Sequence, residues 1–109
     1  MQPTEKHLVS IIVPTFNRTD MICDTLESVS SQTYRPIEIL VVDDGSTDAT
    51  EKTVKKWAES QNSTVSLRYI YQNNAGAPTA RNRGYKESNG DFVKWLDSDD
   101  VLGSTHIEH

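Results

Sequence analysis

The sequence predicts an α/β fold, in which helices cover the faces of a mostly parallel β-sheet. Four short runs rich in apolar and β-branched residues alternate with three segments of helical periodicity, in the order β-α-β-α-β-α-β. The connections between these segments are short, and parallel strands joined in this way need right-handed crossovers through the helices. Two of the runs are almost continuously apolar, which is typical of strands buried on both faces.

The first strand is predicted over residues 8–13, where Pro14 ends the apolar run. A polar loop, residues 14–18, leads into a helix that we expect over about residues 19–31, with Thr19 as its N-cap. Apolar side chains recur on one face of this segment at positions i, i+4 and i+7, namely Ile22, Leu26 and Val29. The segment is therefore predicted to be an amphipathic helix.

The second strand is predicted over residues 37–42, and the polar segment 43–46 follows it. The next helix is expected over about residues 47–60, because acidic residues stand in its first turn and lysines stand later, which matches the helix dipole. Its apolar stripe consists of Val54, Trp57 and Ala58.

The third strand, residues 65–71, alternates with period two, so one of its faces is expected to be less buried. Pro78 suits the first turn of a helix that runs to about Ser88. Residues 91–96 form the last predicted strand. Small residues share one face of the last helix, and these are Ala77, Ala80 and Gly84. That face can approach the sheet or a ligand closely.

The composition is that of one globular domain. The chain has 109 residues, is 35% hydrophobic and 25% charged, and contains no segment as long as a membrane span. Its net charge of −5 argues against nucleic acid as a partner, because phosphate backbones bind basic surfaces. The lone Cys23 excludes an internal disulfide, and the polar N-terminus does not look like a secretory signal. We therefore expect a cytoplasmic protein.

Polar loops follow three of the predicted strands, at residues 14–17, 43–46 and 97–100. In parallel α/β sheets, ligands bind beyond the carboxyl ends of the strands. The last loop carries three acids, Asp97, Asp99 and Asp100. Carboxylates this close stay ionised together only if water, a cation or strong donors lie between them. Because oxygen ligands suit Mg²⁺ or Mn²⁺, we predict a metal and phosphate site.

Each of these features also has a structural interpretation. The segment 43–46 suits a turn with a helix cap, and the acids after the last strand suit a solvated turn. Arg81 can reach an anionic ligand at the strand ends, whereas Arg83 is expected to pair with a surface acid. The sequence contains no P-loop and no G-x-G-x-x-G after the first strand, and its histidines form no cluster.

Several ordered motifs resemble those of family 2 inverting glycosyltransferases over about residues 8–102. They are residues 9–17 (VSIIVPTFN), 31–34 (SQTY), 38–48 (EILVVDDGSTD), 80–84 (ARNRG) and 96–100 (LDSDD). A lone D-x-D occurs often by chance, but motifs that agree in order and spacing make this resemblance specific.

The resemblance implies a GT-A fold, whose Rossmann-like N-terminal half binds a nucleotide diphosphate sugar, commonly a UDP-sugar, with Mn²⁺ or Mg²⁺. By resemblance, nucleotide contacts fall on Pro14, Thr15, Asn17, Asp44 and Arg81, with a ribose or metal-water contact at Asp97. The D-x-D signature implies metal coordination by Asp99, with Asp97 and Asp100 as further ligands. A cation between Asp99 and the diphosphate would offset charge on the departing nucleotide.

Members of this family carry a second half, with an acceptor pocket and a later Asp or Glu that deprotonates the acceptor hydroxyl. This sequence stops soon after the D-x-D, so no residue is assigned as the general base. We expect residues 1–102 to be the donor-binding half of a longer glycosyltransferase, inactive in transfer by itself. Residues 103–109 are expected to be a disordered tail or an expression remnant.

The acceptor is left open between a carbohydrate, a lipid carrier and a protein, and the longer enzyme could be peripheral to a membrane. A domain cut from a larger core can expose apolar surface and self-associate. An alternative function is a non-catalytic module that binds a nucleotide sugar or a metal. A phospho-acceptor signalling domain is disfavoured, because it would place an acid pair after the first strand, where Pro14 and Thr15 stand here.

Overall fold

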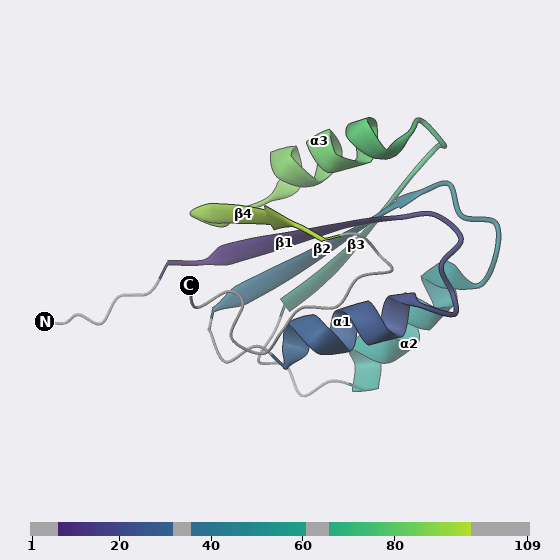
Figure 1. The fold of residues 1–109 in the computed structure, drawn as a ribbon, viewed down its shortest axis with the longest axis horizontal. Helices are drawn as coiled ribbons and strands as arrows, with labels where there is room; N and C mark the ends of the chain where they lie inside the picture. The colour runs from purple at the N-terminus through teal and green to yellow at the C-terminus, as the bar shows by residue number, and fades with distance from the viewer. Residues whose placement is uncertain (1–6, 32–35, 61–65, 97–109) are drawn as a thin grey trace, which may run out of the picture.

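A computed structural model describes residues 7–31, 36–60 and 66–96 of the chain. Its four strands form one parallel sheet with the order β3-β2-β1-β4 (Figure 1). The elements are β1 (Val9–Thr15), α1 (Ile22–Ser30), β2 (Ile37–Asp44), α2 (Thr50–Ser60), β3 (Ser66–Gln72), α3 (Ala77–Glu87) and β4 (Phe92–Trp95). The predicted order of strands and helices and the parallel sheet are therefore confirmed.

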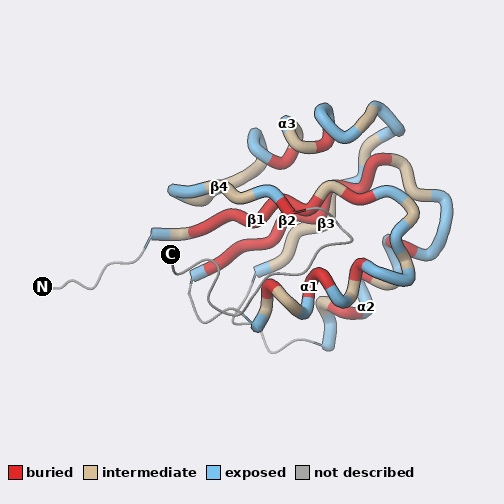
Figure 2. Tube along the Cα trace, in the orientation of Figure 1, coloured by how far each residue is buried: buried red, intermediate tan, exposed pale blue. Residues whose placement is uncertain are grey.

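Helices α1 and α2 cover one face of the sheet, and α3 covers the other (Figure 1). Side chains alternate between these faces along each strand. Ile11 and Val13 join the large core under α1 and α2, whereas Ile12 packs with Val42 and Ala80 below α3. Figure 2 shows the buried centre of the molecule running along β1 and β2. Both strands are buried on their two faces, as their apolar sequences predict.

The central strands extend further than the sequence predicted. β1 continues through Pro14 to Thr15, so the prediction that Pro14 ends it is wrong. The backbone of Pro14 faces the β4 side of the sheet, as does that of Ile12, whose carbonyl accepts from the N–H of Leu96 at 2.9 Å. Because β4 ends at Trp95, the missing N–H of the proline costs no hydrogen bond to that strand.

Helices α1 and α2 begin about three residues later than predicted. α1 starts at Ile22 and Met21 provides no side-chain cap, so the prediction of Thr19 as N-cap is wrong. α2 starts at Thr50, whose N–H donates to the carboxylate of Asp48 at 2.9 Å, so Asp48 pairs one of the first N–H groups of the helix. The predicted apolar faces are confirmed, because their large side chains lie in the core: Ile22, Leu26, Val29, Val54 and Trp57.

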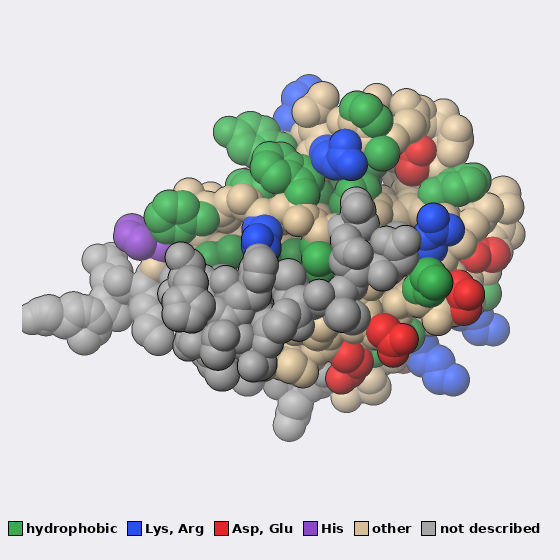
Figure 3. Space-filling view, viewed as in Figure 1, with side chains coloured by type: hydrophobic (Ala, Val, Ile, Leu, Met, Phe, Trp, Pro, Cys, Tyr) green, Lys and Arg blue, Asp and Glu red, His purple; other side chains and the backbone are tan. Residues whose placement is uncertain are grey.

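The two edge strands are more exposed than the central pair. β3 is half-buried over most of its length. Leu67 and Tyr69 pack against one core and Ile70 against the other, so the predicted difference between its two faces is not seen. At the other edge of the sheet, large side chains of α3 and β4 are exposed, those of Tyr85, Phe92 and Trp95. Figure 3 shows apolar side chains gathered over these two elements. Within the described ranges, no helix is both long and apolar enough to cross a membrane.

Helix α3 lies very close to the sheet at Gly84. A Cβ atom added at Gly84 would lie 2.4 Å from Cγ2 of Ile12, which is too short for two carbon atoms. Ile12 is fully buried and β-branched, so its side chain has little freedom to move away. Ala80, one turn earlier, packs in the same small core. Ala80 and Gly84 of the predicted small-residue face therefore contact the sheet, whereas Ala77, its third member, is exposed.

Replacing Gly84 with alanine should lower the free energy of unfolding by about 1–3 kcal/mol, because the added methyl group overpacks the contact with Ile12. Helix propensity alone would predict a gain of about 1 kcal/mol. Urea denaturation followed by circular dichroism measures the difference. Thr79→Ala, at an exposed position of the same helix, is the control and should change stability by less than about 0.5 kcal/mol. A more stable Gly84→Ala variant would contradict the close contact.

Candidate nucleotide-binding site

The loops after β1 and β2 meet at the carboxyl edge of the sheet, where Asn17 joins them. Asn17 has a φ of 52°, a left-handed conformation that asparagine adopts more readily than most residues. Its N–H donates to Oγ of Ser46 at 2.8 Å, and its Oδ1 accepts from the N–H groups of Thr47 at 2.9 Å and Asp48 at 3.3 Å. Asn17 therefore fixes one loop against the other.

A second set of hydrogen bonds ties the start of α2 to the loop after β1. The hydroxyl of Thr50 accepts from the N–H of Arg18 at 3.1 Å and lies 3.2 Å from the hydroxyl of Thr19. Asp48 accepts from Thr50 and, at 3.4 Å, from the N–H of Thr19. Desolvation acts to raise the pKa of Asp48, but the hydrogen bonds outweigh it and lower that pKa to about 2. Asp48 therefore stays ionised over most of the pH range and keeps accepting from the first N–H of α2.

Asp43 and Gly45 shape the turn after β2. Asp43 is fully buried, and its carboxylate accepts from the N–H of Ser46 at 2.8 Å and from the hydroxyl of Tyr69 on β3. Burial and the contact with Asp43 raise the pKa of Tyr69, so the phenol keeps its proton. Gly45 has a φ of 85°, and a Cβ there would lie 2.9 Å from the backbone nitrogen of Asn74. The turn therefore requires glycine at this position.

Asp44 holds the loop between β3 and α3. One of its carboxylate oxygens accepts from the side-chain amide of Gln72 and from the N–H of Ala75, both at 2.8 Å. The other accepts from the N–H of Gly76 at 2.9 Å and from the amide of Asn74 at 3.4 Å. Burial acts to raise the pKa of Asp44, but the hydrogen bonds outweigh it and keep that pKa below its usual value.

The sequence did not predict these partners of Asp44. A polar loop between a strand and a helix does not indicate which carboxylate it will contact. The structure shows that Asp44 and Gln72 are paired on neighbouring strands, a register that no local sequence pattern indicated. A carboxylate accepts about four hydrogen bonds, so a ligand that binds Asp44 has to replace the side-chain amide of Gln72 or Asn74.

Thr15 ends β1 with an unpaired polar atom. The residue is 3% exposed, and its Oγ1 has no hydrogen-bond partner in the described part of the chain. Leaving a buried hydroxyl unpaired costs about 1–3 kcal/mol. In the sheet, Thr15 lies beside Asp43 and Pro14 lies beside Val42. The structure therefore brings Pro14, Thr15, Asn17 and Asp44 to one edge of the sheet.

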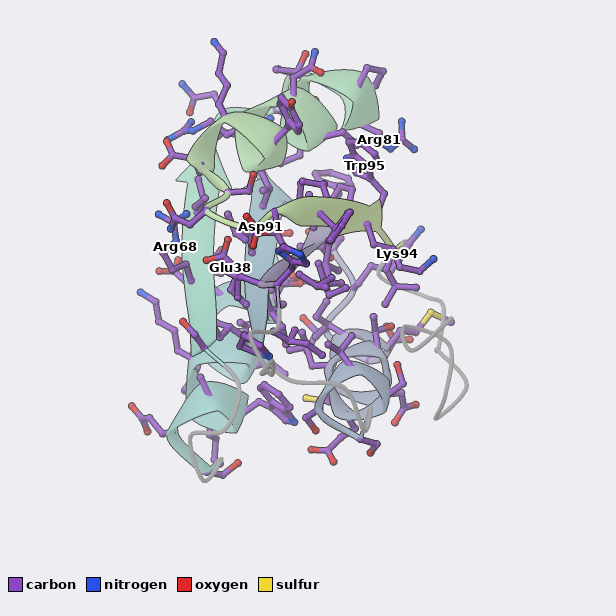
Figure 4. All side chains as sticks on the ribbon, turned by 90° about the vertical axis from the view of Figure 1, so that its left-hand side faces the viewer. Glu38, Arg68, Arg81, Asp91, Lys94 and Trp95 are labelled. Atoms are coloured by element: carbon purple, nitrogen blue, oxygen red, sulfur yellow. The ribbon has the colours of Figure 1, made fainter. Side chains whose placement is uncertain are left out.

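Arg81 lies one turn into α3, the helix whose preceding loop is held by Asp44. Its side chain is half-buried, and in Figure 4 it projects from α3 on the side where Trp95 of β4 lies. Arg83 pairs with Glu87, with 3.5 Å between Nε and Oε2. The predicted pairing of Arg83 with a surface acid is thus confirmed.

The predicted metal ligands Asp97, Asp99 and Asp100 lie outside the described residues. Leu96 comes directly before them, and its N–H bonds to the carbonyl of Ile12, so β4 delivers the chain to the edge where β1 reaches Thr15. Within residues 7–31, 36–60 and 66–96, no group of three or more His, Cys, Asp or Glu side chains could hold a metal ion.

Comparison with known proteins shows which family the chain belongs to. The model of the family described as Glycosyl transferase family 2 matches residues 10–109. Glycosyltransferase GlyA of Streptococcus pneumoniae serotype 4 is 39% identical over 100 residues, which make up 92% of this chain and 14% of GlyA.

Two solved structures are similar in sequence and fold. S. aureus TarS 1-349 in complex with UDP is 34% identical, with a TM-score of 0.82 over 92% of this chain and 30% of that one. Mannosyltransferase PcManGT from Pyrobaculum calidifontis, in complex with GDP-Man and Mn²⁺, is 30% identical, with a TM-score of 0.84 over 91% of this chain and 29% of that one. The chain thus spans less than a third of the length of each of these three proteins.

These matches confirm the resemblance that the motifs indicated and the GT-A, Rossmann-like arrangement of the sheet and helices. The family match includes all four strands except the first residue of β1. The chain belongs to glycosyltransferase family 2.

Proposed function

We propose that this chain binds a nucleotide diphosphate sugar, with a uridine nucleotide and a divalent cation, at the carboxyl edge of its sheet. In a longer protein, the bound sugar would be transferred to a hydroxyl group of an acceptor. Family membership supports sugar transfer in general. A nucleotide donor is supported by TarS, which binds UDP, and by PcManGT, which binds GDP-Man. Uridine is favoured because TarS shares the higher identity with this chain.

The observation that carries the proposal is the unpaired hydroxyl of Thr15. Thr15 ends β1, the strand between β2 and β4, and ligands of parallel sheets bind beyond such strand ends. A polar group of the nucleotide would supply the missing hydrogen bond. The neighbouring turn is already fixed by Asn17, so little ordering is needed on binding.

Asp44 has two roles in this proposal. It holds the start of α3 through the N–H groups of Ala75 and Gly76. Its carboxylate would also accept a hydrogen bond from an N–H of the base, after the side-chain amide of Gln72 or Asn74 has moved away. One N–H donor then replaces another, so the net cost of the exchange is small. Because the pKa of Asp44 is lowered, the carboxylate is ionised at neutral pH and acts as an acceptor.

The acids Asp97, Asp99 and Asp100 would hold the cation. Their carboxylates are the hard oxygen ligands that Mn²⁺ and Mg²⁺ prefer, and β4 leads to them at the edge that contains Thr15. The donor set therefore fits a divalent cation. PcManGT was solved with Mn²⁺, which supports such an ion. When bound, the cation supplies positive charge to the diphosphate of the departing nucleotide.

The residues of this chain would bind and orient the donor. Thr15 and Asp44 would hold the nucleoside, and Asp97 would contact the ribose or a metal-bound water. Arg81 would approach the diphosphate, because a guanidinium can donate two parallel hydrogen bonds to phosphate oxygens. A donor held in one orientation reacts more readily with an acceptor than one that is free to tumble. The proposal assigns no general base to this chain.

Replacing Thr15 with valine, which keeps the shape but lacks the hydroxyl, should weaken UDP binding by about tenfold. The free energy of unfolding should stay equal or increase, because the unpaired hydroxyl gives no stability. Isothermal titration calorimetry and urea denaturation measure the two effects. Thr25→Val, at a buried position of α1, is the control and should leave the UDP affinity unchanged. A Thr15→Val variant that binds UDP normally would refute this use of the hydroxyl.

Chelating the divalent cation should weaken UDP binding, because the three acids then repel the diphosphate. Calorimetric titration of UDP in Mn²⁺ and in EDTA measures the difference, which Asp99→Ala should abolish. Asp24→Ala, which removes an exposed acid on α1, is the control and should leave the difference in UDP affinity between Mn²⁺ and EDTA unchanged. UDP binding that is equally tight with and without Mn²⁺ would rule out this metal role.

The 109-residue chain should bind a UDP-sugar without transferring the sugar. Release of UDP and labelling of carbohydrate, lipid-carrier and protein acceptors measure transfer. Robust transfer by the chain alone would overturn this expectation. The alternative, a non-catalytic nucleotide-sugar module, shares the binding site, so transfer has to be measured in a longer protein that contains this chain. Transfer that is lost on Asp99→Ala supports the enzyme, and binding without transfer there supports the module.

A further inference from the structure

Helix α3 is attached to β2 at both of its ends. Glu38 and Asp44 lie six residues apart on the face of β2 that α3 covers, which is a distance of about 20 Å along a strand. Gly76 and Asn89, which bracket the helix, lie thirteen residues apart, also about 20 Å at the rise of a helix. The two carboxylates are therefore spaced to hold the two ends of α3.

Glu38 fastens the chain where it leaves the helix. Its Oε2 accepts from the N–H of Asn89 at 2.6 Å and from the hydroxyl of Ser10 at 2.5 Å. The hydroxyl of Ser10 in turn accepts from the N–H of Gly90 at 2.9 Å. Two consecutive backbone N–H groups after α3 are thus bound to β1 and β2.

Arg68 on β3 reinforces this end of the helix. Its guanidinium donates to the carbonyl of Glu87 and lies 3.6 Å from the Glu87 carboxylate. Burial acts to raise the pKa of Glu38, but the hydrogen bonds from Ser10 and Asn89 and the charge of Arg68 outweigh it, so that pKa is lowered. Figure 4 shows Glu38 and Arg68 below α3, at the edge of the sheet where the strands begin. Glu38 is therefore an ionised and nearly buried group at neutral pH.

A buried carboxylate is costly unless its neighbours compensate it, and an apolar side chain would fill the same position more cheaply. Glu38 lies too far from the carboxyl edge to touch a nucleotide there. We propose that Glu38 is a positioning residue for nucleotide binding: it fixes the far end of α3 and thereby, together with Asp44, the placement of Arg81. The inference rests on the proposed function, in which Arg81 approaches the diphosphate.

The placement of α3 matters because a small shift of Arg81 would weaken its proposed contact with the diphosphate. Arg81 lies five residues after Gly76, about 7.5 Å along the helix. If the end held by Glu38 were released, the helix could pivot about its start, and a tilt of about 10° would move Arg81 by about 1 Å. A misplacement of about 1 Å can lower the rate of a positioned reaction by about 100-fold.

UDP binding in the presence of Mn²⁺ tests the inference in four proteins: the unaltered chain, Glu38→Gln, Arg81→Ala and the double variant. Glu38→Gln should weaken binding by about 2- to 30-fold. The double variant should bind no more weakly than Arg81→Ala, because Glu38 acts through Arg81. Glu59→Gln, at an exposed position of α2, is the control and should bind normally. Independent losses that multiply in the double variant, or normal binding by folded Glu38→Gln, would overturn the inference.

Amide hydrogen exchange supplies a readout that needs no nucleotide. In Glu38→Gln, amides in the last turn of α3 should exchange faster while those of α1 and α2 stay unchanged. Asn89→Pro removes the N–H that reaches Glu38, and the extended Ser88 before it accommodates a proline, so this variant should show the same two effects. Asn89→Pro is used for both measurements if Glu38→Gln does not fold.

The two measurements separate the inference from the proposed function. Equal loss of protection in all three helices would show a general role in stability and would contradict positioning. If the unaltered chain fails to bind UDP, the proposed function fails and nucleotide positioning fails with it. The exchange result then still decides whether Glu38 holds α3.

Discussion

Strand β2 is buried along its whole length, and this burial determines what its three carboxylates do. A carboxylate removed from water is stable only when hydrogen-bond donors or positive charges surround it. Glu38, Asp43 and Asp44 each collect N–H or O–H donors from other segments, in one case from a residue 51 positions away. Compensation of these charges therefore joins β1, β2, β3 and α3 into one unit.

Hydrophobic periodicity was sufficient to predict the strands and helices but not where they begin and end. The buried strands could be recognised from their continuous apolar runs, because both faces of a parallel sheet need apolar residues. The helix starts were harder, because cap preferences describe only local chemistry. Thr19 has the chemistry of an N-cap, yet its hydroxyl lies against that of Thr50, 31 residues away. Contacts between the loops outweighed the local preference.

The residues of the candidate site could be chosen from the sequence, whereas their partners could not. Asn17 and Asp44 were predicted to contact a ligand, and the structure shows that both bind protein groups. The contact of Asp44 with Gln72 follows from the register of β2 on β3, which no local pattern encodes. The unpaired hydroxyl of Thr15 is likewise a property of the packing around it rather than of its neighbours in sequence.

Charge links the nucleotide and the cation in the proposed site. The chain carries a net charge of −5, β2 ends in Asp43 and Asp44, and Asp97, Asp99 and Asp100 follow β4 in the sequence. Two like charges 4 Å apart repel by about 1 kcal/mol in water and by about 4 kcal/mol near a protein surface. A diphosphate brought next to Asp97, Asp99 and Asp100 would meet this repulsion several times over, and Arg81 could offset only part of it. A divalent cation among the acids both keeps them ionised and attracts the diphosphate, so nucleotide binding and metal binding are one proposal rather than two.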